Sequence, residues 1–348
     1  MDTNISEPFV SVIMPVYNCG NYIAESLESI LNQSLADFEF IIIDDCSTDN
    51  TIAVINRYHD QRIRLIIKEK NSGYVDSLNT GIEMAKGKFL ARMDGDDISV
   101  ITRLEKQVKF LDDHPEIALC GAWYQLLSST EVIQHPVENE EIKIALLDYC
   151  ALGHPTVMFR KGFIDEHNLH YESGFRPAED YDLWTRISAV GKMANIPEIL
   201  LYYRSHNDQV SIKEKGKQLS NSLLCRTRML CYPLIEVSNN DLRLSALVPE
   251  NEKIVEPGLL EEVIDWLEKV KKANISSCFY ELRLFSAYID QKKAAFIRSY
   301  YLNTTSYNPG VLIRFLKAKR GFNRYFSMIE QIKLVLKCLV FWKTNLMN

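Results

Sequence analysis

The sequence predicts an α/β protein with a doubly wound, mostly parallel sheet, followed by a helical extension. Over the first hundred residues, short apolar runs rich in β-branched residues alternate with amphipathic helix patterns. That order is typical of a parallel sheet with helices on both faces. Beyond about residue 215 the apolar residues recur only at helical spacing. We therefore expect an α/β domain at 1–212, with halves of about 8–98 and 99–212, and a helical region at 213–348.

The first strand is expected at residues 9–14, an apolar, β-branched run that ends at Pro15. A helix is expected next at 22–32, because Ile23, Leu27 and Ile30 fall on one face. The same patterns predict further strands at 38–43, 63–68, 88–93, 117–124, 153–159 and 196–204. They predict further helices at 50–58, 75–85, 102–113, 180–190, 261–272 and 292–301.

Polar residues follow several of these strands. Tyr17, the pair 44–45 and the cluster 94–97 all come directly after a predicted strand. Ligands of doubly wound sheets bind at the carboxyl ends of strands, so these residues are expected to meet at one site. The carboxylates of the cluster 94–97 suit a hard divalent cation such as Mg²⁺, although Asp and Gly also suit an ordinary turn. Glu179 and Asp180 begin a predicted helix, where acids either supply a base or favour the helix dipole.

Several classes of function are excluded. No GxGxxG follows the first strand and no GxxxxGK[ST] occurs, which argues against dinucleotide-binding proteins and P-loop NTPases. The net charge of −6 gives no indication of nucleic-acid binding. The eight cysteines form no CxxC pair and no zinc spacing, so we expect buried free thiols in a reducing cytoplasm. We expect no signal peptide and no membrane-spanning helix, which needs about 18 apolar residues.

The C-terminal segment has an unusual charge. Residues 311–348 hold eight Lys and Arg against one acid, Glu330, and contain the apolar run 334–342. A basic amphipathic helix can lie on an anionic membrane surface, so we expect peripheral attachment to the inner face of the cell membrane. The alternatives are a packed terminal helix with a solvated basic face, or a dimer contact.

A set of motifs in a fixed order resembles a known family. The set comprises VSVIMPVYN at 10–18, IIDDCSTD at 42–49, NSG at 71–73, MDGDD at 93–97, AEDYDLW at 178–184 and YRSH at 203–206. It resembles the inverting family 2 glycosyltransferases, which have a GT-A fold, over roughly residues 8–211. Cys46 departs from the pattern, because the family often has Gly there; we expect little consequence.

The resemblance implies a role for each motif. It implies an Mg²⁺ or Mn²⁺ ion held mainly by Asp96, with Asp94 and His206, and Asp180 as the general base. It implies a nucleotide-sugar site that includes Pro15, Tyr17, Asp44, Asp45, Asn71, Asp94 and Gly95. A carboxylate at 44–45 would accept a hydrogen bond from a base imide, which favours uracil or thymine. The acceptor side would include Glu179, Trp184 and His154.

The activity implied is transfer of a single hexose from a UDP-sugar to a glycan or lipid-linked acceptor in surface polysaccharide biosynthesis. Several alternatives stay open. Trp184 and His154 are also compatible with structural positions, and Arg204 with either a phosphate contact or an acidic neighbour. A sugar nucleotidyltransferase would want a Gly-rich, basic loop after the first strand, and the loop 15–21 has no Lys or Arg. The other alternative is an inactive relative that serves as an assembly module.

Overall fold

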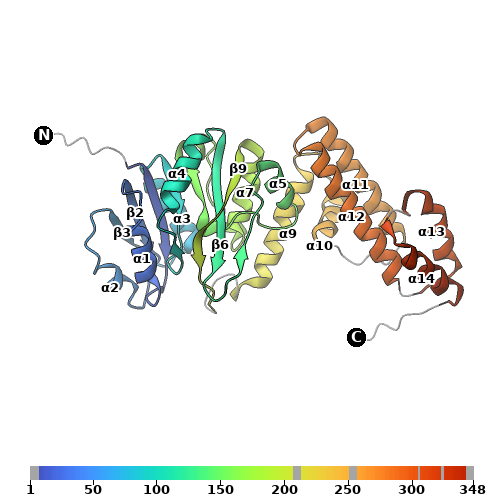
Figure 1. The fold of residues 1–348 in the computed structure, drawn as a ribbon, viewed down its shortest axis with the longest axis horizontal. Helices are drawn as coiled ribbons and strands as arrows, with labels where there is room; N and C mark the ends of the chain where they lie inside the picture. The colour runs from blue at the N-terminus through green and yellow to red at the C-terminus, as the bar shows by residue number, and fades with distance from the viewer. Residues whose placement is uncertain (1–7, 207–212, 251–256, 305, 323–324, 342–348) are drawn as a thin grey trace. The chain divides into compact units, whose positions relative to one another are not determined.

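The structure is a computed structural model and describes residues 8–206, 213–250, 257–304, 306–322 and 325–341. The chain forms two compact units, Met1–Cys225 and Arg226–Asn348 (Figure 1). The boundary between them falls inside helix α9 (Lys215–Cys231). The α/β domain was predicted to end at 212, shortly before this helix begins.

The first unit contains one sheet, whose strand order is β3-β2-β1-β4-β8-β6-β9-β5, with β7 paired to β6. The long strands run in one direction: β1 Val10–Val16, β2 Phe38–Asp44, β3 Ile63–Ile67, β4 Phe89–Arg92, β6 Ile117–Leu126 and β9 Lys192–Tyr203. Three short strands run against them: β5 Ile98–Ser99, β7 Val132–Ile133 and β8 Met158–Arg160. The predicted mixed, mostly parallel sheet is therefore confirmed.

Helices follow the strands as the sequence patterns predict. The helices of this unit are α1 Ile23–Leu31, α2 Thr51–Ile55, α3 Tyr74–Met84, α4 Arg103–Asp113, α5 Asn139–Ala145, α6 Lys161–Glu166 and α7 Glu179–Val190, with short 3₁₀ turns η1 His154–Thr156 and η2 Ser173–Phe175. The core between sheet and helices includes Val12, Met14 and Ile42 of the central strands and Ile23 and Leu27 of α1, all buried. Burial of such side chains is the main favourable term in folding.

Two predicted elements differ from the structure. The strand predicted at 153–159 is wrong for most of its length, because residues 154–156 form η1 and strand β8 begins only at Met158. Pro155 lacks the N–H that a sheet ladder needs, and the Thr156 hydroxyl donates to the Gly153 carbonyl at 2.7 Å, which closes the turn. The helix predicted at 50–58 is shorter, because α2 ends at Ile55.

The loops after β1 and β2 are fastened to each other, which fixes one edge of the sheet. The Asn18 side-chain oxygen accepts a hydrogen bond from the Thr48 amide at 2.8 Å, and the Gly20 amide donates to Asp49 at 2.9 Å. A Cβ at position 20 would lie only 1.9 Å from the Asn50 side-chain oxygen, so any other residue here would displace the Asn50 side chain. The two loops therefore present a rigid edge at the carboxyl ends of the central strands.

The second unit is built from helices α10 Asn239–Glu250, α11 Pro257–Ser277, α12 Leu282–Asn303, α13 Pro309–Phe322 and α14 Met328–Leu339. The helices predicted at 261–272 and 292–301 lie within α11 and α12. An edge-to-face aromatic cluster of Tyr301, Phe315 and Phe326 joins α12, α13 and the segment that leads into α14. Among the described helices, none combines the length and the apolar character that crossing a membrane requires.

Candidate active site

A cavity of about 710 Å³ opens at the carboxyl ends of β1, β2 and β4 and extends to the start of α7. Every residue that the sequence predicts for the site lines this cavity except Asp44 and Trp184. The structure therefore brings together motifs that lie more than a hundred residues apart in the chain. This position matches the expectation for a doubly wound sheet.

The acidic cluster lies in the loop after β4. Asp94, Asp96 and Asp97 each offer an oxygen, and these oxygens lie within 4.8 Å of one another. Burial raises the pKa of Asp94, an effect that its ion pair with Arg92 opposes. Burial also raises the pKa of Asp97 well above its ordinary value, and its Oδ2 has no hydrogen-bond partner among the described residues. A divalent cation would relieve this crowding of carboxylates, and hard oxygens are the ligands that Mg²⁺ and Mn²⁺ prefer.

The segment after β9 holds the acidic loop in place. The Arg204 backbone amide donates to Asp97 Oδ1 at 2.8 Å, and its Nε donates to the Asp96 carbonyl at 2.8 Å. Its guanidinium also pairs with Glu25 at 2.7 Å, so the structure shows the acidic neighbour that was one of the two alternatives for this residue. The His206 ring lies with Nε2 2.8 Å from Asp96 Oδ2 and stacks on Tyr22. The carboxylate of Asp96 is thus held in one orientation.

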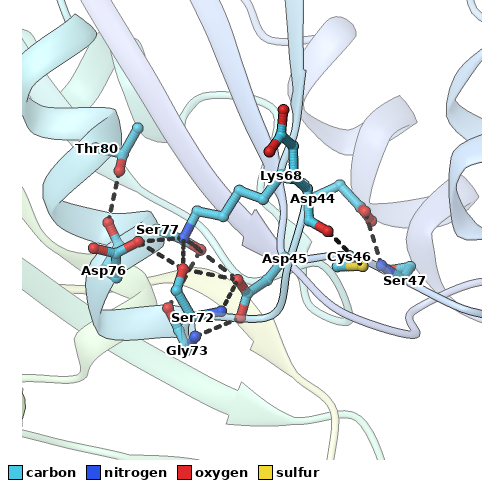
Figure 2. A network of polar contacts seen from close by, with 11 residues as sticks. Asp44, Asp45, Cys46, Ser47, Lys68, Ser72, Gly73, Asp76, Ser77 and Thr80 are labelled. Carbon is cyan, nitrogen blue, oxygen red and sulfur yellow. Dashed lines mark hydrogen bonds and ion pairs between the residues drawn. The ribbon is translucent and has the colours of Figure 1, made fainter.

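A second network fixes the edge of the cavity that follows β2 (Figure 2). The Asp45 carboxylate accepts hydrogen bonds from the backbone amides of Ser72, at 2.9 Å, and Gly73, at 2.8 Å. Figure 2 shows the Lys68 side chain reaching into this network, where Nζ lies 2.7 Å from Asp76 and 3.4 Å from Asp45. Asp45 is therefore both a wall of the cavity and the anchor of the loop that carries Asn71.

The two predicted residues outside the cavity are both fully buried. Asp44 Oδ2 accepts a hydrogen bond from the Ser47 amide at 2.9 Å, so this carboxylate shapes the turn after β2. The Trp184 ring packs against Phe159 and His154, with ring centroids 5.6 and 6.0 Å apart. The structure therefore gives Trp184 the core position that was the alternative to an acceptor contact.

The acidic pair Glu179-Asp180 begins α7, where the helix dipole favours negative charge. Asp180 Oδ1 accepts a hydrogen bond from the Tyr181 amide at 2.7 Å, and the Cys150 thiol lies 3.6 Å from its Oδ2. Burial raises the pKa of Asp180. A carboxylate with a raised pKa is a stronger base than an ordinary carboxylate.

Glu179 lies beside Asp180 and belongs to a buried polar chain. Its Oε2 accepts a hydrogen bond from the Tyr74 hydroxyl at 2.7 Å. His154 Nδ1 lies 3.9 Å from its Oε1, and His154 Nε2 lies 2.9 Å from the Tyr171 hydroxyl. Burial lowers the pKa of His154 well below its ordinary value, so the ring is neutral. This series of polar side chains connects the cavity wall to the core.

The buried environment of Glu179 leads to a pH-dependent prediction. Burial and then the Asp180 charge raise the pKa of Glu179 from 4.5 to about 7. A carboxyl group whose pKa is higher in the folded than in the unfolded state contributes its full stabilisation at pH values below the unfolded-state pKa. This contribution is lost as the pH rises through the folded-state pKa. Glu179→Gln removes that loss, so between about pH 5.5 and 8 its unfolding free energy should gain roughly 1–3 kcal/mol relative to wild type.

Thermal unfolding at the two pH values measures this gain. Glu116→Gln, at an exposed position, is the matched control and should follow wild type at both. A stability difference between Glu179→Gln and wild type that does not change with pH would show that Glu179 titrates as an ordinary carboxyl.

Some residues of the cavity were not predicted from the sequence. Arg92 is buried at the end of β4, and its charge opposes the rise that burial causes in the pKa values of Asp94, Glu179 and Asp180. The only signal for it was a charged residue in an otherwise apolar strand. Arg176 contributes from the other side, where it pairs with Glu214 at 2.5 Å and lies over the Tyr74 ring; the sequence carried no signal for it.

Comparison with known proteins agrees with this geometry. Residues 11–175 match the family model for glycosyl transferase family 2. An uncharacterized glycosyltransferase of Haemophilus influenzae is 32% identical over 244 residues, which cover 66% of this chain and 76% of the relative. An Escherichia coli protein, the UDP-Glc:alpha-D-GlcNAc-diphosphoundecaprenol beta-1,3-glucosyltransferase WfaP, is 32% identical over 213 residues, which cover 60% of this chain and 82% of that protein.

The crystal structure of S. aureus TarS 1-349 in complex with UDP-GlcNAc has a similar fold. Its TM-score is 0.57 at 17% identity, and the match covers 83% of this chain and 90% of that one. At this identity the likeness concerns the fold alone. It confirms the GT-A architecture with a helical extension.

Proposed function

The chain belongs to glycosyl transferase family 2, and on that premise we propose that it is a metal-dependent, inverting transferase. It moves a single sugar from a UDP-sugar to a glycan or lipid-linked acceptor. One observation carries the proposal: the carboxylates of Asp94 and Asp96 and the carboxyl of Asp180 face one cavity from separate elements. A transferase of this kind needs both a cation for the departing diphosphate and a base for the acceptor.

The residues of the acidic loop fit a divalent metal. Asp96 and Asp94 would hold Mg²⁺ or Mn²⁺, with His206 beside Asp96. Asp97 belongs to the same acidic cluster, and its Oδ2 has no hydrogen-bond partner among the described residues. The ion would supply Lewis-acid stabilisation of the charge that develops on the leaving diphosphate. Arg204 keeps the loop backbone in position through its hydrogen bond to the Asp96 carbonyl.

Asp180 acts as the general base. The acceptor hydroxyl gives its proton to the Asp180 carboxylate while its oxygen forms the new bond to the anomeric carbon. The bond from that carbon to the diphosphate breaks, and its electron pair leaves with the diphosphate. A single displacement through an oxocarbenium-like transition state inverts the anomeric configuration and needs no enzyme nucleophile. The Tyr181 amide orients the carboxylate for this step.

The nucleotide lies between the loops after β1 and β2. Tyr17, whose exposed fraction is 47%, offers a ring for the base, and Asp45 and Asn71 line the wall beside it. A carboxylate accepts from the imide N–H of uracil, which purines do not offer in the same place. The name of WfaP gives UDP-Glc as its donor and a diphosphoundecaprenol-linked sugar as its acceptor. These names support a UDP-sugar, a lipid-linked acceptor and a role in surface polysaccharide synthesis.

A donor screen tests the proposal. The purified protein would be incubated with UDP-, GDP- and dTDP-sugars in Mn²⁺, and release of the nucleoside diphosphate would be measured. NMR of the freshly released sugar, recorded before its anomers equilibrate in water, would report its anomeric configuration. We expect release from a UDP-sugar and an inverted product. Equal release in EDTA, or retention of configuration, would contradict the mechanism.

Two alternatives from the sequence are weaker. The chain belongs to a glycosyltransferase family, which argues against a sugar nucleotidyltransferase. An inactive assembly module would not need Asp180, so substitution of this residue distinguishes the module from the enzyme that we propose.

A further inference from the structure

Helix α14 has two apolar faces, and packing accounts for only one of them. Leu334 and Cys338 point into the second unit and are buried. The opposite face carries Met328, Ile329, Ile332, Leu336, Leu339 and the flanking Val340, each at least half exposed. These positions fall on one side of a helix of 3.6 residues per turn. The outward face is thus a continuous apolar stripe of three turns.

Polar contacts at both ends fix which face points outward. The Ser327 hydroxyl and the Glu330 carboxylate form a capping box that starts the helix. Glu330 also pairs with Arg298 of α12, which lies 3.0 Å away, and Lys337 lies 3.3 Å from the Tyr307 hydroxyl. Rotation of α14 to bury the stripe would break these contacts. These contacts therefore hold the stripe on the outer surface of the second unit.

The neighbouring helix α13 also exposes apolar residues, and basic residues lie close in sequence to both sets. Ile313 and Leu316 of α13 are about half exposed, and α13 packs beside α14. Lys333 borders the stripe on α14, and Lys317 follows Leu316; both are exposed. A large apolar surface bordered by cations is a recognised sign of an interaction site.

Charge is distributed unevenly along the chain. Residues 311–348 hold eight Lys and Arg and one acid, a net charge of +7. The whole chain has 40 Lys and Arg against 46 acids, so residues 1–310 hold 32 against 45 and carry −13. The basic charge is therefore concentrated in the segment that also carries the apolar stripe.

We propose that the outward stripe of α14 docks onto an anionic lipid bilayer surface. The helix lies in the interface plane, with its apolar side chains in the acyl boundary and its lysines at the headgroups. It does not cross the bilayer, because 12 residues of α-helix span about 18 Å and the hydrocarbon core is about 30 Å thick.

A second copy of the chain is the competing occupant, and charge disfavours it. A two-fold antiparallel dimer through this stripe would place Lys333, in the middle of α14, near Lys333 of the other copy. Like charges brought together in this way oppose association, whereas anionic headgroups favour the same lysines. The lipid surface is thus the partner whose charge and shape match both features.

Vesicle flotation of the full chain tests the proposal. Wild type should float with phosphatidylcholine vesicles that contain about a third phosphatidylglycerol, and bind at least roughly tenfold less to pure phosphatidylcholine. Raising NaCl to roughly 0.5 M should weaken binding without abolishing it, because salt screens charge and leaves apolar burial. The double variant Ile332→Glu, Leu336→Glu should lose at least roughly tenfold, because two carboxylates would enter the acyl boundary.

Ile275→Glu is the matched control, because Ile275 of α11 is equally exposed and lies outside the stripe. It should float like wild type, and far-ultraviolet circular dichroism should show that all variants are folded. Wild type that does not float, or a double variant that floats equally, would overturn the proposal. So would a wild-type dimer that the double variant makes monomeric, with neither binding vesicles. The assay uses no nucleotide, so its outcome is independent of the proposed activity.

Discussion

Replacing Asp180 by Asn is expected to lower kcat by about a thousandfold while the affinity for the nucleotide stays within twofold. Asn has the shape of Asp and can still accept from the Tyr181 amide at the start of α7. It cannot take a proton from an acceptor hydroxyl. Steady-state kinetics of transfer, with titration of UDP on the same sample, separate the two effects.

The neighbouring Glu179→Gln is the comparison for this variant. Glu179 transfers no proton in our mechanism, and the Tyr74 hydroxyl can still donate a hydrogen bond to a Gln side chain at this position. We expect a loss of kcat well below that of Asp180→Asn. If Asp180→Asn retained full activity, Asp180 would not be the base, and the inactive assembly module would regain support.

Replacing Asp96 by Ala is expected to have the second large effect. Without its carboxylate the loop after β4 loses the metal ligand that we propose, which His206 contacts. We expect transfer to fall by at least about a thousandfold, because stabilisation of the leaving diphosphate is lost. Binding of UDP in the presence of Mn²⁺ should weaken in parallel. Titration with increasing Mn²⁺ should recover little of either.

An exposed acid provides the control. Asp113→Ala removes a carboxylate that pairs with Lys109 on the surface of α4, and it should leave both transfer and the Mn²⁺ response unchanged. If Asp96→Ala kept the activity and Mn²⁺ dependence of wild type, the metal would be held elsewhere or would have no part in the reaction.

Much of the site follows from strand ends and motif order. Tyr17, Asp45 and Asp96 each follow a strand whose apolar pattern is plain, and parallel strands bring their carboxyl ends to one edge. Asp180 was visible as an acid at a helix start, and the resemblance gave it the role of base and added His206; no local pattern connects either residue to that edge. The structure brings all five to one cavity.

What sequence patterns missed depends on tertiary contacts. Trp184 lies on a helix next to Asp180, yet its ring faces the core, and only packing against Phe159 decides this. Strands β5 and β7 have two residues each, too few to show any periodicity. Cys46 has a φ of 67°, in the left-handed region that favours Gly, which is a physical reason for Gly at this place in the family pattern. No pattern of apolar residues reports a backbone angle.

Isothermal titration of the purified chain with UDP, GDP and dTDP, each in Mn²⁺ and then in EDTA, tests the central claim most directly. The claim is that the cavity after β1, β2 and β4 binds a uridine nucleotide through a metal held by Asp96. It predicts tight binding of UDP that disappears in EDTA and in Asp96→Ala, and weaker binding of GDP. Absence of binding by all three nucleotides to the folded protein would contradict it.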